Sequence, residues 1–125
     1  MSYKDELFEK MLNIFFEHQI KIKMFHFQTK TYGGHLASDK YLEKYIENFD
    51  KLFEVIQGVM GKFNFKKIVI DCEIPNDDYI INELEKFSKI FREFDKYFIK
   101  YTEIQNIRDE MLGDIDQFKY LLTFK

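Results

Sequence analysis

Hydrophobic positions recur at intervals of three and four residues along four stretches of the chain, which predicts amphipathic helices. The first stretch runs from residue 3 to about residue 29 without Pro or Gly. The second runs from about His35 to Met60 and follows the double glycine Gly33-Gly34, which indicates a turn. The third stripe is the most regular: Ile80, Leu84, Phe87, Phe91, Phe94, Phe98 and Tyr101. The fourth consists of Ile104, Ile107, Met111, Ile115, Phe118 and Leu122.

The segments between these stretches differ in character. Residues 62–75 are the least helical part: a short β-branched run lies before Pro75, and we expect an extended connection, with an isolated strand as one option. Asn76 or Asp77 is expected to cap the third helix. No Gly or Pro separates the third and fourth stripes, so a single long helix remains an alternative. The capping-box pattern from Thr102 to Gln105 nevertheless favours a break near residues 100–102.

Four such helices, with one longer connection between the second and the third, predict an all-α fold. The expected architecture is an antiparallel four-helix bundle with one crossover connection, the ferritin-like arrangement. A length of 125 residues is enough to bury a real core, and residues 1–125 are expected to form a single domain.

Composition narrows the class of protein. A hydrophobic content of 46% with 33% charged residues is ordinary for a soluble globular protein. The net charge of −3 and the few lysines near the termini argue against strong nucleic-acid binding. Cys72 is the only cysteine, so an intrachain disulfide is excluded and nothing indicates secretion. No apolar run approaches the roughly 20 residues of a membrane span, and we expect a cytoplasmic protein without a membrane partner.

Candidate chemistry lies on the second helix, where His35 and Asp39 form one i, i+4 pair and Asp50 and Glu54 form another. The gap of eleven residues between Asp39 and Asp50 is almost three turns, so both pairs share one face. At about 1.5 Å per residue, however, these two carboxylates are roughly 16 Å apart. They can reach one metal ion only if two copies of the helix cross antiparallel about a two-fold axis near Lys44-Tyr45, in at least a dimer.

The run around His26, the short loop after it and the His35, Asp39, Asp50, Glu54 pattern together resemble the ferroxidase motif of the Dps family, the twelve-subunit mini-ferritins. The resemblance implies non-haem iron at a two-fold subunit interface. His26 of one subunit would act with Asp50 and Glu54 of the other, while His35 and Asp39 would support a second iron or its water. It further implies oxidation of ferrous iron by hydrogen peroxide, with storage of the ferric product inside a shell. Such ligands would also accept zinc or manganese.

Several alternatives stand beside this hypothesis. The acidic residues of the second helix could form a solvated edge without any metal. The protein could also be a structural or interaction protein, of cellular or viral origin, that has a ferritin-like bundle and no catalysis. A bundle that sequesters zinc or manganese without redox turnover is a third option. His18 is expected to be a hydrogen-bonded interior histidine, Cys72 to be unreactive, and Glu110 and Asp114 to be poor candidates for metal ligands.

Overall fold

The computed structural model describes residues 2–76 and 78–124, and these residues form helices and connections with no β-strand. The elements are α1 (Tyr3–Gln28), α2 (Tyr32–Met60), α3 (Ile80–Glu93), the short 3-10 helix η1 (Phe94–Tyr97) and α4 (Thr102–Leu121). The prediction of an all-α protein with four helices is therefore confirmed, and the option of a strand between residues 62 and 75 is wrong.

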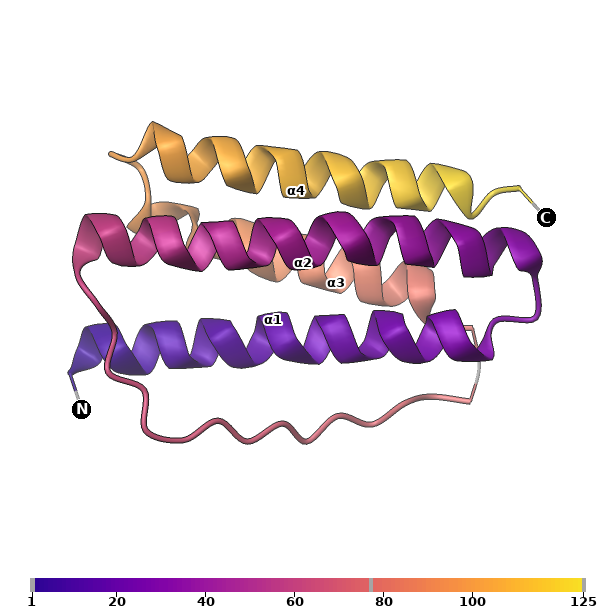
Figure 1. The fold of residues 1–125 in the computed structure, drawn as a ribbon, viewed down its shortest axis with the longest axis horizontal. Coiled ribbons are helices and arrows are strands. Elements are labelled where there is room, and N and C mark those ends of the chain that lie inside the picture. Colours follow the sequence, from indigo (N-terminus) through magenta and orange to yellow (C-terminus); the bar gives the residue numbers. More distant parts are fainter. Residues whose placement is uncertain (1, 77, 125) are drawn as a thin grey trace.

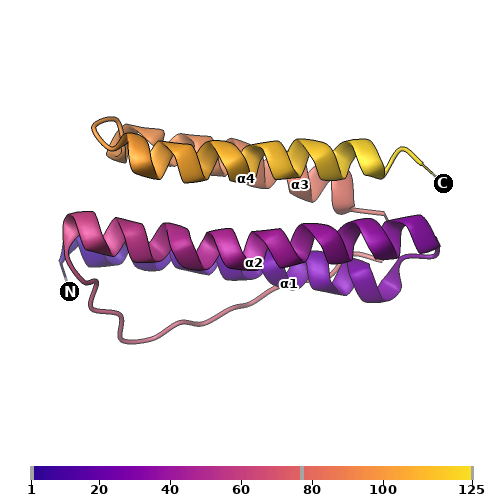
Figure 2. The ribbon, with the colours of Figure 1, turned by 45° about the horizontal axis from the view of Figure 1, so that its top comes forward.

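The four helices pack in two layers (Figure 2). One layer is the antiparallel hairpin of α1 and α2, and the other contains α3 and α4, which are also antiparallel. A long connection between α2 and α3 returns along the whole length of α1, on the side of α1 that faces away from α2 (Figure 1). The chain path is therefore a bundle with one crossover connection between the second and third helices, as predicted.

Aromatic side chains fill much of the core between the two layers. Phe15 of α1 is fully buried, and its ring lies 5.1–6.3 Å, centroid to centroid, from five other aromatic rings: Tyr45, Phe49, Phe53, Phe87 and Phe91. Most of these contacts are edge-to-face or tilted, the geometry that aromatic pairs prefer. The phenylalanine stripes read from the sequence therefore converge on one residue of the first helix.

The second helix begins three residues earlier than predicted, at Tyr32 instead of His35. Thr31 is the N-cap, and its hydroxyl accepts the backbone N–H of Gly34 at 3.0 Å. Gly33 and Gly34 thus lie in the first helical turn, and the reversal of the chain is confined to residues 29–31. A Cβ atom on Gly34 would lie 2.7 Å from Oγ1 of both Thr29 and Thr31. The lack of a side chain at Gly34 therefore allows these two threonine hydroxyls to lie close to the helix backbone.

Replacing Gly34 with alanine is expected to displace the Thr31 hydroxyl and to lower the free energy of unfolding by about 1 kcal/mol, the usual value of a lost N-cap. Gly58→Ala on the same helix is the matched control, because a Cβ atom there meets nothing within 4 Å. Alanine at this site should stabilise the protein by about 0.5–1 kcal/mol through its higher helix propensity. Urea unfolding measures both changes, and a neutral Gly34→Ala would refute the crowding argument.

The connection between α2 and α3 is extended and is anchored to α1. Gly61 ends α2 at a φ of +89°, a backbone conformation that favours glycine. Phe63 is buried and stacks on Phe8 with ring centroids 4.3 Å apart. Near the other end, the Tyr79 hydroxyl donates to the carbonyl of Lys21 at 3.1 Å. Side-chain anchors on α1 take the place of the backbone pairing that a strand would have.

The helix break predicted near residues 100–102 is confirmed, because α4 begins at Thr102. The start of α3 and the end of its stripe differ from the sequence prediction. Tyr79 is the N-cap of α3, so Asn76 is not the cap, and Asp77 lies outside the described residues. The stripe expected to continue to Tyr101 is interrupted, because α3 ends at Glu93 and η1 follows. The capping box at Thr102 is also wrong: Tyr101 is the N-cap of α4 and no side chain caps it. Instead, the Gln105 amide donates to the carbonyls of Phe98 (2.8 Å) and Ile99 (3.1 Å).

Candidate functional site

His26 and His35 lie against each other where α1 ends and α2 begins. Their rings stack with centroids 4.0 Å apart and an interplanar angle of 23°. Nδ1 of His26 donates to the carbonyl of His35 at 3.1 Å, and Nδ1 of His35 donates to the carbonyl of His26 at 3.0 Å. The short turn between α1 and α2 thus brings the two histidines together.

Ser38 completes this histidine pair from inside the bundle. Its hydroxyl is buried, donates to the His35 carbonyl at 3.0 Å and lies 3.0 Å from Nδ1 of His26. With the proton held on Nδ1, each neutral imidazole carries its lone pair on Nε2. Histidines that bind metals are commonly held in this way, by an Nδ1–H donated to a backbone carbonyl. His26 is buried, with 7% of its surface exposed, and His35 is exposed.

The three carboxylates of the predicted site lie apart from the histidine pair along α2. Asp39, Asp50 and Glu54 are exposed, and in the described part of the chain their carboxylates make no hydrogen bond or ion pair with another residue. Within residues 2–76 and 78–124, no cluster of three or more His, Cys, Asp or Glu side chains could hold a metal ion. One chain thus brings together two of the five predicted site residues.

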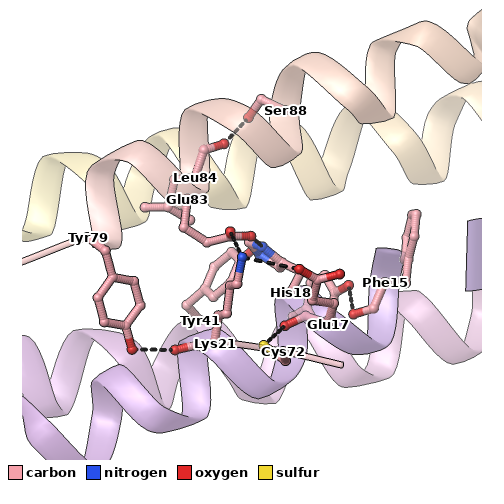
Figure 3. Close-up of polar contacts among 11 residues, drawn as sticks. Phe15, Glu17, His18, Lys21, Tyr41, Cys72, Tyr79, Glu83, Leu84 and Ser88 are labelled. Atoms are coloured by element: carbon pink, nitrogen blue, oxygen red, sulfur yellow. Dashed lines mark hydrogen bonds and ion pairs between the residues drawn. The ribbon is translucent and has the colours of Figure 1, made fainter. Parts of the chain in front are cut away.

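A second polar cluster lies inside the bundle around His18, which is fully buried (Figure 3). Nδ1–H of His18 donates to Oε2 of Glu83 at 2.6 Å, and Nε2 accepts the hydroxyl of Tyr41 at 2.8 Å. The other oxygen of Glu83 lies 3.4 Å from the Lys21 ammonium, which also pairs with Glu17 at 3.2 Å. The prediction that His18 is a hydrogen-bonded interior histidine is confirmed.

Burial and pairing set the protonation of this cluster. Burial lowers the pKa of His18, and its neutral form suits a ring that donates at one nitrogen and accepts at the other. Burial alone would raise the pKa of Glu83, but the hydrogen bond from His18 and the charge of Lys21 outweigh it and lower that pKa. Burial strongly raises the pKa of Tyr41. The cluster therefore holds an ionised carboxylate, a neutral imidazole and a neutral phenol.

Glu83 was not identified from the sequence. It lies between Ile80 and Phe87 on the apolar stripe of α3, where a charged residue interrupts an otherwise hydrophobic face. His18 occupies an equivalent position on the stripe of α1. Two polar residues that each interrupt a core-facing stripe are the signal that could have paired them, although 65 residues separate them in sequence.

Asp114 and Cys72 are the remaining residues that the sequence analysis considered. Asp114 accepts a hydrogen bond from the Asn48 amide at 3.3 Å and lies 3.9 Å from the Lys44 ammonium. Burial raises the pKa of the Cys72 thiol, which disfavours the reactive thiolate. The raised pKa of Cys72 agrees with the expectation that this thiol is unreactive.

A protein-family model matches residues 26–122, and it describes a family of unknown function, DUF5856. The match includes the histidine pair and extends through the whole of α4. The chain belongs to DUF5856. No curated protein matches the sequence, and no solved structure matches it. Within the described residues, no helix combines the length and apolar character needed to cross a membrane.

Membership of DUF5856 overturns the assignment to the Dps family, which is wrong. The prediction of a twelve-subunit shell depended on that assignment alone and is not carried further. What remains is the geometry of the residues themselves.

Proposed function

We propose that two copies of this DUF5856 chain together bind divalent transition-metal ions and oxidise ferrous iron. His26 and His35 of one copy would supply imidazole ligands, and Asp50 and Glu54 of the second copy would supply carboxylates. Asp39 would hold a second ion or its bound water. In the oxidation, each of two ferrous ions would lose one electron, and hydrogen peroxide would take up both electrons and two protons to give two waters.

The histidine pair is the observation that supports this proposal best. Both Nδ1–H groups are held by backbone carbonyls, so both Nε2 lone pairs can bind a metal without a change of tautomer. Two imidazoles are too few for a stable transition-metal site, which usually has four or more ligands. The exposed carboxylates of α2 are of the type that would complete it, and mixed imidazole and carboxylate ligation suits ferrous iron, zinc and manganese.

We also propose that the bundle is ferritin-like in its chain path. Two antiparallel helix pairs are joined by one long crossover between α2 and α3, which is the connectivity of that class. The class commonly places metal sites between helices. The metal site proposed for this chain differs in lying between two copies, because its carboxylates and His35 are exposed on one hairpin.

Cobalt(II) binding and peroxide-driven oxidation of ferrous iron, measured on the full chain, test the proposal. His26→Ala and Asp50→Ala are each expected to weaken cobalt binding by at least about 10-fold, because each removes a ligand. Glu47→Ala, another exposed carboxylate of α2, is the matched control and should leave cobalt affinity unchanged. If both ligand variants oxidise iron at the wild-type rate, the assigned site is wrong.

Mixing the two inactive variants tests whether the site is shared between copies. In a mixed dimer, one of the two sites would combine His26 of one chain with Asp50 of the other. Random exchange makes about half of the dimers mixed, so about a quarter of the wild-type sites should return. No recovery in a mixture that has demonstrably exchanged subunits would refute a site shared in this way.

A structural role for the histidine pair is the second candidate. The reciprocal hydrogen bonds between His26 and His35 tie the end of α1 to the start of α2 without any metal. In that case the protein would be a structural or interaction protein without catalysis. His26→Ala would then lower the free energy of unfolding, while added cobalt would not stabilise the wild type.

A further inference from the structure

The outer face of the α1–α2 hairpin carries exposed apolar side chains at its centre. Phe16 and Ile20 of α1 are 37% and 36% exposed, and Ile46 of α2 is 48% exposed. Phe16 contacts the ring of Phe49 edge-on at 5.1 Å, so it lies at the groove between the two helices. The long connection crosses the first turns of α1, where Phe63 stacks on Phe8, and then runs on the side of α1 that faces away from α2 (Figure 1).

Charges flank this apolar centre symmetrically along α1. Glu9 and Lys23 each lie seven residues from Phe16, in opposite directions. Seven residues is almost two turns, so both residues lie on the same face as Phe16. Lys23 is exposed, whereas Glu9 is half-buried and its Oε2 is buried with no hydrogen-bond partner among the described residues. They are about 21 Å apart along the helix and cannot pair within one chain. A second α1 that crosses antiparallel at Phe16 would bring each Glu9 to the Lys23 of the other copy.

The proposed metal ligands on α2 are also arranged symmetrically about a midpoint. This midpoint lies beside Phe16 of α1. Asp39 and Asp50, like His35 and Glu54, are centred between Lys44 and Tyr45. The Tyr45 hydroxyl donates to the carbonyl of Phe15, the neighbour of Phe16, at 2.8 Å. Two independent patterns, one on each helix, therefore share one centre, as a two-fold axis through the face would require.

We infer that this outer face binds a second copy of the chain, antiparallel, about a two-fold axis that passes near Phe16 and Ile46. Phe16, Ile20 and Ile46 of both copies form the apolar centre, and two Glu9–Lys23 pairs form across it. The inference rests on the proposed function in one respect only, namely that Asp50 and Glu54 of one copy approach the histidine pair of the other. The apolar centre and the Glu9–Lys23 pairs need no metal. Asp39 and Asp50 of opposite copies would repel, so a cation between them tightens the dimer.

Light scattering of the metal-free full chain, over a range of concentrations in chelator, tests the surface. The wild type is expected to dimerise, and Ile46→Glu is expected to weaken the dimer by at least about 100-fold, because two charges enter an apolar centre. The control is Ile81→Glu on α3, where the isoleucine is 38% exposed on the other layer, and it should leave the dimer unchanged. A monomeric wild type, or equal effects of the two variants, would overturn the inference.

A charge exchange tests the register. Lys23→Glu and Glu9→Lys are each expected to weaken the metal-free dimer by about 10-fold, because each places like charges together at two symmetric positions. The double variant in one chain should recover most of that loss. Since the two positions are too far apart to interact within a chain, recovery must come from contact between copies. A double variant weaker than both single variants would rule out this register.

The failure of the surface and the failure of the metal site are distinguishable. His26→Ala should lose cobalt binding and remain a dimer. If instead the mixed His26→Ala and Asp50→Ala dimers recover cobalt binding while Ile46→Glu still dimerises, the assigned surface is wrong and the shared site stands. If Ile46→Glu dissociates the dimer while His26→Ala binds cobalt normally, the surface stands and the metal site is wrong.

Discussion

Replacing Phe15 with alanine is expected to lower the free energy of unfolding by about 3–5 kcal/mol, the range for deleting a buried phenylalanine. The ring is completely buried and touches five other aromatic rings contributed by α2 and α3. These neighbours belong to rigid helices in both layers, so the cavity cannot collapse around the smaller side chain. Since small domains are stable by about 5–15 kcal/mol, the variant should lie close to the unfolding threshold.

Urea unfolding followed by circular dichroism measures this effect, and Phe27→Ala is the matched control. Phe27 is on the same helix, but it is 65% exposed. Its replacement should change the free energy of unfolding by no more than about 0.5 kcal/mol. Equal losses in the two variants would mean that Phe15 is not at the centre of the core.

Replacing Glu83 with leucine is expected to cost about 3 kcal/mol, because it leaves the Nδ1–H of His18 without an acceptor and removes one partner of Lys21. Glu83→Gln should cost less, since its amide oxygen can still accept from His18. Glu85→Leu is the control on the same helix: its carboxylate is largely exposed and pairs with Lys119 at 3.7 Å, a surface contact worth little. Similar losses for Glu83→Leu and Glu85→Leu would contradict the buried cluster.

The buried pair of His18 and Glu83 makes the free energy of unfolding depend on pH. The pKa of His18 is lowered in the folded state, so the unfolded chain binds more protons and stability falls as the pH drops below about 6.5. The pKa of Glu83 is also lowered from its usual value of 4.5, which adds a further loss at more acidic pH. Glu83→Leu should keep the first loss and reduce the second. Urea midpoints measured at pH 7.5, 5.5 and 4 separate the two.

The chemistry-bearing residues were predictable to different degrees for physical reasons. His26 and His35 are nine residues apart on either side of a short turn, so local geometry alone brings them together. His18 was recognisable as an interior residue because it lies on an apolar stripe. Its partner Glu83 was not, because the contact spans 65 residues and depends on how α3 lies against α1.

The sequence prediction was wrong at helix ends that are set by a side-chain hydrogen bond. The glycine pair was taken as a turn, but the Thr31 hydroxyl makes Gly34 part of the first helical turn. The capping box at Thr102 was likewise overruled by Gln105, whose amide binds the carbonyls of the preceding turn. Helix ends leave several backbone groups unpaired, and more than one side chain can satisfy them.

The periodicity of apolar residues by itself determined that the chain is helical and which face of each stretch is buried, because burial of a stripe demands the 3.6-residue period. It left open whether the third and fourth stripes belong to one helix or two. Only the tertiary structure decided that Phe15 packs against aromatic rings of both α2 and α3, and that Glu83 pairs with His18. It also decided that one hairpin carries Phe16, Ile20 and Ile46 together on its outer surface. Such contacts depend on the relative height and rotation of packed helices, and the sequence of a single helix contains no information about either.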